Sequence, residues 1–224
     1  QESLPILIDG LKSLEYRGYD SAGVVVLANG KAKLARAVGT VSSLEDKING
    51  ARFPGATGIA HTRWATHGGV TEGNAHPHAD CDGQIFVVHN GIIENYRELQ
   101  EQLIKKGHRF RSQTDTETLP HLIEQIRRTA PALPLEDAVA KALRQVKGTY
   151  GIVVCDAREP DKIVAARNFS PLVLGIGQGE GLVASDPSAI TKITTSVVYL
   201  HDGEVAAVTP TGYRIRTLAN KEID

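Results

Sequence analysis

The feature that most constrains the fold is a series of short apolar runs in the last third of the chain. Glycine, proline, aspartate or asparagine separates each run from the next. Short segments joined by short turns are typical of antiparallel sheet, whereas parallel strands need a crossover helix between them. We predict strands at residues 150–156, 162–166, 172–176, 182–184, 197–200, 204–208 and 213–216.

The first two thirds of the chain mix helices with strands. Asn29-Gly30 is a strong hairpin signal between β-rich segments at 22–27 and 31–38. Two further strands are predicted at 57–60 and at 84–89. Apolar residues recur at helical spacing in several segments, and we predict helices at residues 3–17, 43–49, 94–106, a stretch carrying Leu119 to Ile126, and 135–146. Thr114 with Glu117 predicts a capping box for the fourth of these. The prediction is one α+β domain over residues 1–224, with helices covering stacked antiparallel sheets.

Composition excludes several classes of protein. The 25 lysines and arginines nearly balance the 26 aspartates and glutamates, so the visible positive excess of a nucleic-acid-binding protein is missing. No apolar run approaches the roughly 20 residues of a membrane span. The two cysteines, Cys81 and Cys155, form no disulfide framework and suit a reducing compartment. We therefore expect a cytoplasmic protein that binds neither nucleic acid nor membrane.

A polar loop follows the predicted strand at 57–60. Residues 61–68 read His-Thr-Arg-Trp-Ala-Thr-His-Gly, and the loop continues to Asn-Ala-His-Pro-His at 74–78. Such a loop needs partners for its many donors and is typical of binding sites. Two later stretches are its candidate complements, at residues 87–91 and 112–117. We interpret the three together as one pocket for a small zwitterionic amide.

Each polar type in these stretches suits one part of such a ligand. Arg63 offers a planar fork for a carboxylate, and Asp115 offers a countercharge for an ammonium group. Asn90-Gly91 supplies two neutral donors for an oxyanion, and Thr66 and His67 add further donors. Taken singly, Arg63 could form a surface ion pair, Asp115 could cap a helix, and Asn90-Gly91 could be a β-turn. The residues alone leave those alternatives open.

Metal and thiol chemistry are the other candidates. His76-Pro-His78-Ala-Asp80 has the H-x-H-x-D spacing of some metallohydrolases, but that motif continues with a further histidine, and residue 81 here is Cys. Histidines that hydrogen-bond loop backbone explain the pattern better, so we expect no metal and no cofactor. Cys155 lies in an apolar run and reads as core. Cys81 lies in a turn whose acidic neighbours raise its pKa and lower its reactivity.

Several motifs together resemble one family along the whole chain. They are Leu-Glu-Tyr-Arg-Gly-Tyr-Asp-Ser-Ala-Gly at 14–23, the loop at 61–68, Asn-Ala-His-Pro-His at 74–78, His-Asn-Gly-Ile-Ile-Glu-Asn at 89–95, Thr-Asp-Thr-Glu at 114–117, Ser-Pro-Leu-Val-Leu-Gly at 170–175 and Ala-Ser-Asp at 184–186. The chain resembles the glutaminase domain of glucosamine-6-phosphate synthases, which is a class II glutamine amidotransferase domain.

The resemblance implies a fold and a set of roles. The fold would be the four-layer αββα sandwich of N-terminal-nucleophile hydrolases, and the substrate L-glutamine. Asn90 and Gly91 would form the oxyanion hole. The remaining residues implied at the site bind substrate or lie next to it: Arg63 for the α-carboxylate, Asp115 for the α-ammonium group, Trp64, Thr66 and His67 as lining, with Trp64 also where ammonia leaves, and His76 and Arg17 nearby.

The nucleophile of that family is an N-terminal cysteine whose own α-amine is the base. It would lie about nine residues before Gln1. Because the chain begins at Gln1 and contains no methionine, we expect a segment before Gln1 that carries this cysteine. The resemblance also implies a C-terminal sugar isomerase module that binds fructose 6-phosphate, a linker beginning near residues 220–224, and a homodimer. A metal-dependent hydrolase using His76, His78 and Asp80, or a non-catalytic amino-acid-binding module, are the alternatives.

Overall fold

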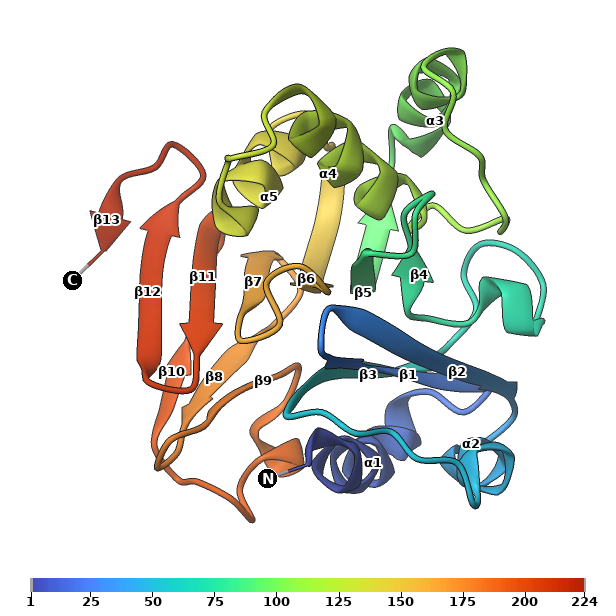
Figure 1. Ribbon diagram of the computed structural model, residues 1–224, viewed down its shortest axis with the longest axis vertical. Coiled ribbons are helices and arrows are strands. Elements are labelled where there is room, and N and C mark those ends of the chain that lie inside the picture. Colours follow the sequence, from blue (N-terminus) through green and yellow to red (C-terminus); the bar gives the residue numbers. More distant parts are fainter. Residues whose placement is uncertain (1, 224) are drawn as a thin grey trace.

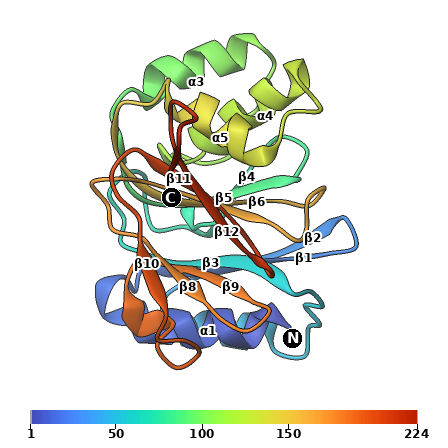
Figure 2. The same cartoon turned by 90° about the vertical axis from the view of Figure 1, so that its left-hand side faces the viewer.

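Four layers stack in the order helix, sheet, sheet, helix in the computed structural model, which describes residues 2–223 (Figures 1 and 2). Every ladder between its named strands is antiparallel, as the short runs predicted. The expectation about Gln1 and the segment before it lies outside the described residues. The predicted α+β sandwich of antiparallel sheets is confirmed.

The first sheet has three strands in the order β2-β1-β3, and two helices cover its outer face. The elements are α1 (Ser3–Leu14), η1 (Glu15–Arg17), β1 (Ser21–Ala28), β2 (Lys31–Val38), α2 (Val41–Ile48) and β3 (Thr57–Arg63). Side chains of β1 alternate between two cores because successive residues of a strand point to opposite faces. Val24 and Val26 pack with Leu11 of α1, whereas Val25 and Leu27 face the other sheet.

The second sheet has seven strands in the order β13-β12-β11-β7-β6-β5-β4. Its strands are β4 (His78–Ala79), β5 (Ile85–Ile93), β6 (Gly148–Asp156), β7 (Ile163–Asn168), β11 (Glu204–Thr209), β12 (Gly212–Thr217) and β13 (Glu222–Ile223). The helices on its outer face are α3 (Tyr96–Lys105), α4 (Thr118–Thr129) and α5 (Leu135–Leu143). In β5, Ile85 and Val87 pack under these helices, while Phe86 and Val88 pack against the first sheet.

A third, smaller sheet completes the inner layers with the order β10-β8-β9. Its strands are β8 (Val173–Ile176), β9 (Gly181–Ala184) and β10 (Val197–Tyr199), and the remaining short elements are η2 (Glu72–Asn74) and η3 (Pro187–Ala189). Leu172 and Leu174 pack on Ala165 of β7 and Val208 of β11, so this sheet covers the inner face of the large one.

Most predicted elements are confirmed, with three differences. Strand β3 continues through His61 to Arg63, and β5 continues through Asn90 and Gly91 to Ile93. Glu222 and Ile223, in the stretch where the resemblance implies the start of a linker, pair with β12 as the short strand β13. Asp224 lies outside the described residues.

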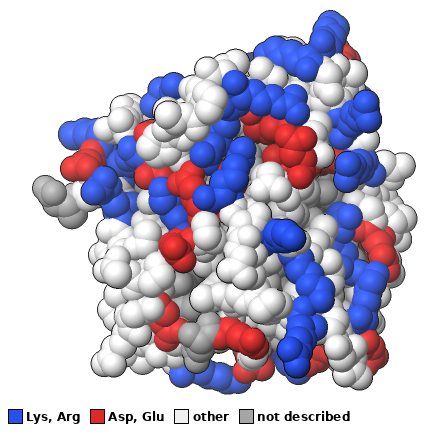
Figure 3. Space-filling view, viewed as in Figure 1, with Lys and Arg blue, Asp and Glu red and all other residues white. Residues whose placement is uncertain are grey.

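The surface carries both signs of charge. Lysine and arginine side chains alternate with aspartate and glutamate over the face in Figure 3, where no single sign covers the whole face. Among the helices described, none is long and apolar enough to cross a membrane.

Candidate active site

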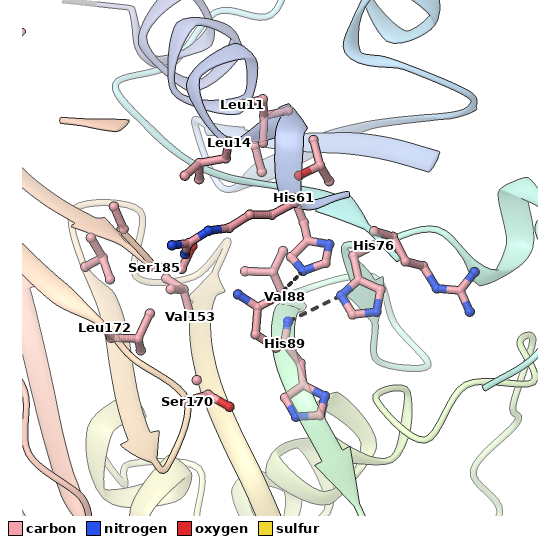
Figure 4. A pocket seen from close by; sticks show the side chains of 18 of the residues that line it. Leu11, Leu14, His61, His76, Val88, His89, Val153, Ser170, Leu172 and Ser185 are labelled. Carbon is pink, nitrogen blue, oxygen red and sulfur yellow. Dashed lines mark hydrogen bonds between the residues drawn. The ribbon is translucent and has the colours of Figure 1, made fainter. Parts of the chain in front are cut away.

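A cavity of about 380 Å³ opens where the three sheets meet (Figure 4). One wall is apolar and comes from Leu11 and Leu14 of helix α1 together with Val153 and Leu172. Much of the rest of the lining is polar. All nine site residues named from the sequence line this cavity: Arg17, Arg63, Trp64, Thr66, His67, His76, Asn90, Gly91 and Asp115.

Arg63 ends strand β3 and is buried, with 4% of its surface exposed. Its Nη2 donates to the carbonyl oxygen of His67 at 2.5 Å, and its Nη1 to that of Gly69 at 3.3 Å. Burial lowers the pKa of this guanidinium, while the carboxylates of Asp20 and Asp115 oppose that shift. Arg63 therefore also holds the loop at 67–69, a structural role that the sequence did not reveal.

Asn90 and Gly91 lie inside strand β5, so the β-turn alternative for them is wrong. They pair with Gly151 and Tyr150 of β6. Gly91 has φ +133°, and a Cβ built there would lie 2.1 Å from the carbonyl oxygen of Thr149. No other residue fits, because L side chains avoid this backbone region and the space is filled. Glycine lets the backbone approach the cavity here.

His61 orients the Asn90 amide, a role that the sequence analysis did not give it. His61 Nε2 lies 2.8 Å from Asn90 Oδ1. Burial lowers the pKa of His61 to about 4, so the ring is neutral near pH 7. A neutral ring that bonds a carbonyl oxygen through Nε2 carries its proton there. The sequence held one signal for this role of His61, which is its position two residues before Arg63.

His76 and His89 extend this layer of buried rings beneath the cavity. The ring centroids of His61 and His76 are 4.3 Å apart and stacked. The His89 backbone N–H donates to His76 Nδ1 at 3.3 Å, which Figure 4 marks with a dashed line. The His89 ring bonds Thr116 Oγ1 at 2.9 Å through Nδ1. Burial lowers the pKa of both histidines, so the floor of the cavity is polar but uncharged.

Asp115 is buried and is tied to strand β5. Its Oδ2 accepts the backbone N–H of Ile93 at 2.7 Å. The capping box predicted from Thr114 and Glu117 is wrong, because no side-chain hydrogen bond caps the start of α4. The Glu117 carboxylate instead accepts the backbone N–H groups of Arg111 at 2.7 Å and Ser112 at 2.6 Å. These bonds turn the chain before α4 and present Asp115 to the cavity.

More exposed residues surround the mouth. Trp64 is 61% exposed and meets Tyr19 edge to face, with 5.5 Å between ring centroids. His67 meets Tyr96 in the same manner. Arg17 forms an ion pair with Asp186 at 2.8 Å. Aromatic rings therefore pack against the two lining residues Trp64 and His67.

The metal alternative built on His76, His78 and Asp80 is not supported, because one ligand atom of each already has a partner and, among the described residues, their ligand atoms do not gather around one point. His76 Nδ1 accepts the His89 N–H, and His78 Nε2 lies 3.0 Å from Thr114 Oγ1. Asp80 Oδ1 accepts the backbone N–H groups that follow the turn, at 2.7 and 3.1 Å. In the described part of the chain, residues that could hold a metal gather at a different place, around Cys81.

Neither cysteine lines the cavity. Cys155 is fully buried in β6, as predicted, and burial raises the pKa of its thiol. The pKa of Cys81 is also raised, as predicted, although the causes are burial and Glu124 rather than its sequence neighbours. The sequence therefore supplies a polar cavity but no thiolate beside it.

Solved structures share this architecture. The chain is similar to the glutamine phosphoribosylpyrophosphate amidotransferase of B. subtilis, with TM-score 0.80 and 25% identity over 97% of this chain and 47% of that one. It is also similar to an allosteric regulatory enzyme of purine biosynthesis, with TM-score 0.82 and 26% identity over the same shares. The sandwich is therefore of the N-terminal-nucleophile hydrolase type.

Sequence comparison narrows this class. Residues 61–192 match the glutamine amidotransferase domain family, and the chain belongs to that family. It is 54% identical over 99% of its length to a glutamine–fructose-6-phosphate aminotransferase (isomerizing) of Chlorobaculum tepidum, and 45% identical over its full length to that of Thermococcus kodakarensis. The chain spans 36–37% of the length of these two relatives.

Proposed function

We propose that this domain hydrolyses the side-chain amide of L-glutamine to glutamate and ammonia. The observation that carries the proposal is the meeting of Arg63, Asp115 and Asn90-Gly91 on one cavity. Opposite charges with neutral donors beside them complement an amino acid that carries a side-chain amide. The match of residues 61–192 to the glutamine amidotransferase domain family supports the same substrate.

The α-carboxylate of glutamine pairs with Arg63 and its α-ammonium group with Asp115. A guanidinium has five N–H donors, so the bonds from Arg63 to loop carbonyls leave further donors for a carboxylate. Asp115 has two oxygens, and Ile93 N–H is bonded to Oδ2. Both side chains are buried, which strengthens their attraction for an opposite charge.

The amide carbonyl of glutamine faces Asn90 and Gly91. His61 Nε2 is hydrogen-bonded to Asn90 Oδ1, so the NH2 group of the Asn90 side chain is free to donate to a ligand. Together with the Gly91 backbone N–H it stabilises the oxyanion that develops during attack. Both donors are fixed in place before the reaction, which is what makes such a hole effective.

The nucleophile is a cysteine that precedes Gln1 and forms the N-terminus of the mature protein. Its α-amine takes the thiol proton while the thiolate attacks the amide carbon. The C–N bond breaks, the proton passes to the departing ammonia, and a thioester remains. Water then hydrolyses the thioester to glutamate and restores the thiol. No metal takes part at this centre, so turnover survives chelation.

The whole protein uses the ammonia for aminosugar synthesis. The high identity to glutamine–fructose-6-phosphate aminotransferases, and the small share of them that this chain spans, support a larger protein of that kind. A C-terminal isomerase domain binds fructose 6-phosphate and receives ammonia past Trp64 to form glucosamine 6-phosphate. By the same resemblance the full polypeptide is a cytoplasmic homodimer.

Two variants of the full-length protein test the site by their contrast. Arg63→Ala should weaken glutamine binding by roughly 2–5 kcal/mol, because the substrate α-carboxylate loses its buried partner. Asn90→Ala should lower kcat by roughly 10²–10³ with little change in affinity, because its donor acts on developing charge. Asn49→Ala, at an exposed position beyond α2, is the matched control. Unchanged affinity in Arg63→Ala, or an Asn90→Ala variant that loses only affinity, contradicts the assignment.

A further inference from the structure

A second group of chemically active side chains lies on the far side of the large sheet from the cavity. Cys81 comes from the turn after β4, His108 follows α3, and His121 and Glu124 lie one turn apart on α4. The side chains of His108, His121 and Glu124 are 0–4% exposed, and Cys81 is half-buried. One ligand atom from each of the four lies within 4.8 Å of all the others.

Four of the six distances between these atoms match the edges of a tetrahedron around a zinc ion. Zn–N bonds of 2.0–2.1 Å and a Zn–S bond of 2.3 Å give N···N edges of about 3.3 Å and S···N edges of about 3.6 Å. The two Nδ1 atoms are 3.3 Å apart, and Cys81 Sγ lies 3.7 and 3.6 Å from those of His108 and His121. The Glu124 Oε2 to His121 Nδ1 distance is 3.3 Å. The 2.9 Å distance from Oε2 to His108 Nδ1 would open by a few tenths of an ångström.

Protons alone satisfy this group poorly. His108 Nδ1, His121 Nδ1 and Glu124 Oε2 form a triangle with sides of 2.9, 3.3 and 3.3 Å. A single proton on one nitrogen leaves two lone pairs facing each other on another side. Protons on both nitrogens would let both N–H groups donate to Glu124 Oε2, which already accepts the backbone N–H of Cys81 at 3.2 Å. A cation at the centre accepts all the lone pairs at once, which is why buried clusters of this kind suit metals.

The groups that surround the four side chains also suit metal ligation. Ligating histidines usually present their second ring nitrogen to a carboxylate or carbonyl oxygen. His108 Nε2 lies 3.0 Å from Gln125 Oε1. His121 Nε2 is buried 3.6 Å from Glu117 Oε1, just beyond hydrogen-bond length. The backbone N–H of Arg109 points to Cys81 Sγ at 3.5 Å, where it would stabilise a thiolate.

We propose that Cys81, His108, His121 and Glu124 form a structural zinc site. One thiolate, two imidazoles and one carboxylate are the donors that Zn²⁺ takes in proteins, and the soft sulfur disfavours Mg²⁺ and Ca²⁺. Four protein ligands complete the tetrahedron and leave no position for substrate. The ion is therefore structural, and it is separate from the glutaminase chemistry.

The site would add a further link between segments that already touch, since the Cys81 backbone N–H donates to Glu124 Oε2 at 3.2 Å. It fastens the turn at Cys81 and the connection at His108 to helix α4, whose preceding residues carry Asp115 into the cavity. The half-buried sulfur, with exposed Asp82 near it at the surface, gives the ion a route of entry. Because an ion that binds only the folded state stabilises it, zinc should raise the melting temperature.

Metal binding can be measured directly on the purified full-length protein. After the metal is stripped with a chelator and the chelator removed, titration with Zn²⁺ should load about one ion per chain, as elemental analysis would show. Co²⁺ as a spectroscopic substitute should give the intense visible bands of tetrahedral coordination and a near-ultraviolet thiolate-to-metal band. A protein that takes up neither ion at micromolar concentration, or a Co²⁺ spectrum without the thiolate band, overturns the proposal.

Matched variants assign the ligands. Cys81→Ser should abolish the thiolate band and weaken zinc binding by at least ten-fold, while Cys155→Ala, which removes the other thiol of residues 1–224, should retain both. Zinc should raise the melting temperature of Cys155→Ala by several degrees and that of Cys81→Ser little. If Cys81→Ser binds zinc as tightly as its control, the ion lies elsewhere and the proposal is wrong. Since the wild-type spectrum needs no variant, misfolding of Cys81→Ser leaves the test intact.

Discussion

His61 Nε2 lies 2.8 Å from Asn90 Oδ1, and this bond joins strand β3 of the first sheet to strand β5 of the large sheet. Because the ring is neutral near pH 7 and donates through Nε2, it selects the amide oxygen of Asn90. The amide NH2 group is then the part left for the cavity. His61 would thereby set the orientation of an oxyanion-hole donor.

Loss of this bond should impair turnover more than binding. We expect His61→Phe to lower kcat roughly 10–100-fold with a much smaller change in KM, because a misdirected donor acts mainly on the transition state. His61→Gln, which keeps an N–H donor, should retain more activity. His201→Phe, at an exposed position, is the control. Steady-state kinetics of glutamate release measures this split, and an unchanged kcat in His61→Phe would show that Asn90 needs no such support.

Gly91→Ala should destabilise the protein as well as inactivate it. The new Cβ would lie 2.1 Å from the Thr149 carbonyl oxygen at φ +133°, so β5 and β6 must separate. Backbone strain of this kind costs about 1–3 kcal/mol before the clash is counted. Gly212→Ala is the matched control, since it has φ +153° and nothing within 4 Å of its Cβ. Thermal unfolding should place Gly91→Ala well below Gly212→Ala, and equal melting temperatures would contradict the prediction.

The buried histidines should make the fold sensitive to mild acid. Burial lowers the pKa of His61 to about 4 and also lowers the pKa of His76, His78 and His89. In the unfolded chain the same groups titrate near 6.5. As pH falls below 6.5 the unfolded chain therefore takes up protons that the native chain refuses. The free energy of unfolding should fall progressively from pH 7 to 5.

One histidine acts in the opposite direction. Burial alone would lower the pKa of His121, but the carboxylates of Glu117 and Glu124 outweigh it and raise that pKa. Its contribution is present below 6.5 and is lost as pH rises through the raised value, so it offsets part of the effect of the other four. Urea unfolding in chelator-containing buffer at pH 7 and pH 5 measures the balance. His61→Gln should flatten the dependence, whereas a midpoint that rises toward pH 5 would contradict the account.

Local patterns predicted most elements of the fold because they depend on neighbouring residues. The continuous apolar run from Val24 to Leu27 and the Asn29-Gly30 turn predict β1 and β2 without distant information. The end of β5 was less predictable. Asn90-Gly91 is a turn signal by itself, and only pairing with β6 keeps it in the sheet.

The site residues were found by motif, but their partners were not. Glu117 matched a capping box, yet its carboxylate turns back to Arg111 and Ser112, a choice made by tertiary packing. The cluster at Cys81 draws on segments far apart in the sequence, with separations that match no short ligand motif. Such contacts follow from the packing of α4 beside β4, which no local spacing encodes.

Covalent labelling tests the central claim most directly. The thiol that attacks glutamine should belong to a residue before Gln1, because Cys155 is buried and Cys81 lies outside the cavity. The full-length protein treated with 6-diazo-5-oxo-norleucine should carry one label, which peptide mass spectrometry should place on an N-terminal cysteine. A chain beginning at Gln1 should stay unlabelled and release no glutamate. Labelling of Cys81 or Cys155, with steady glutamate release from the chain beginning at Gln1, would contradict the account.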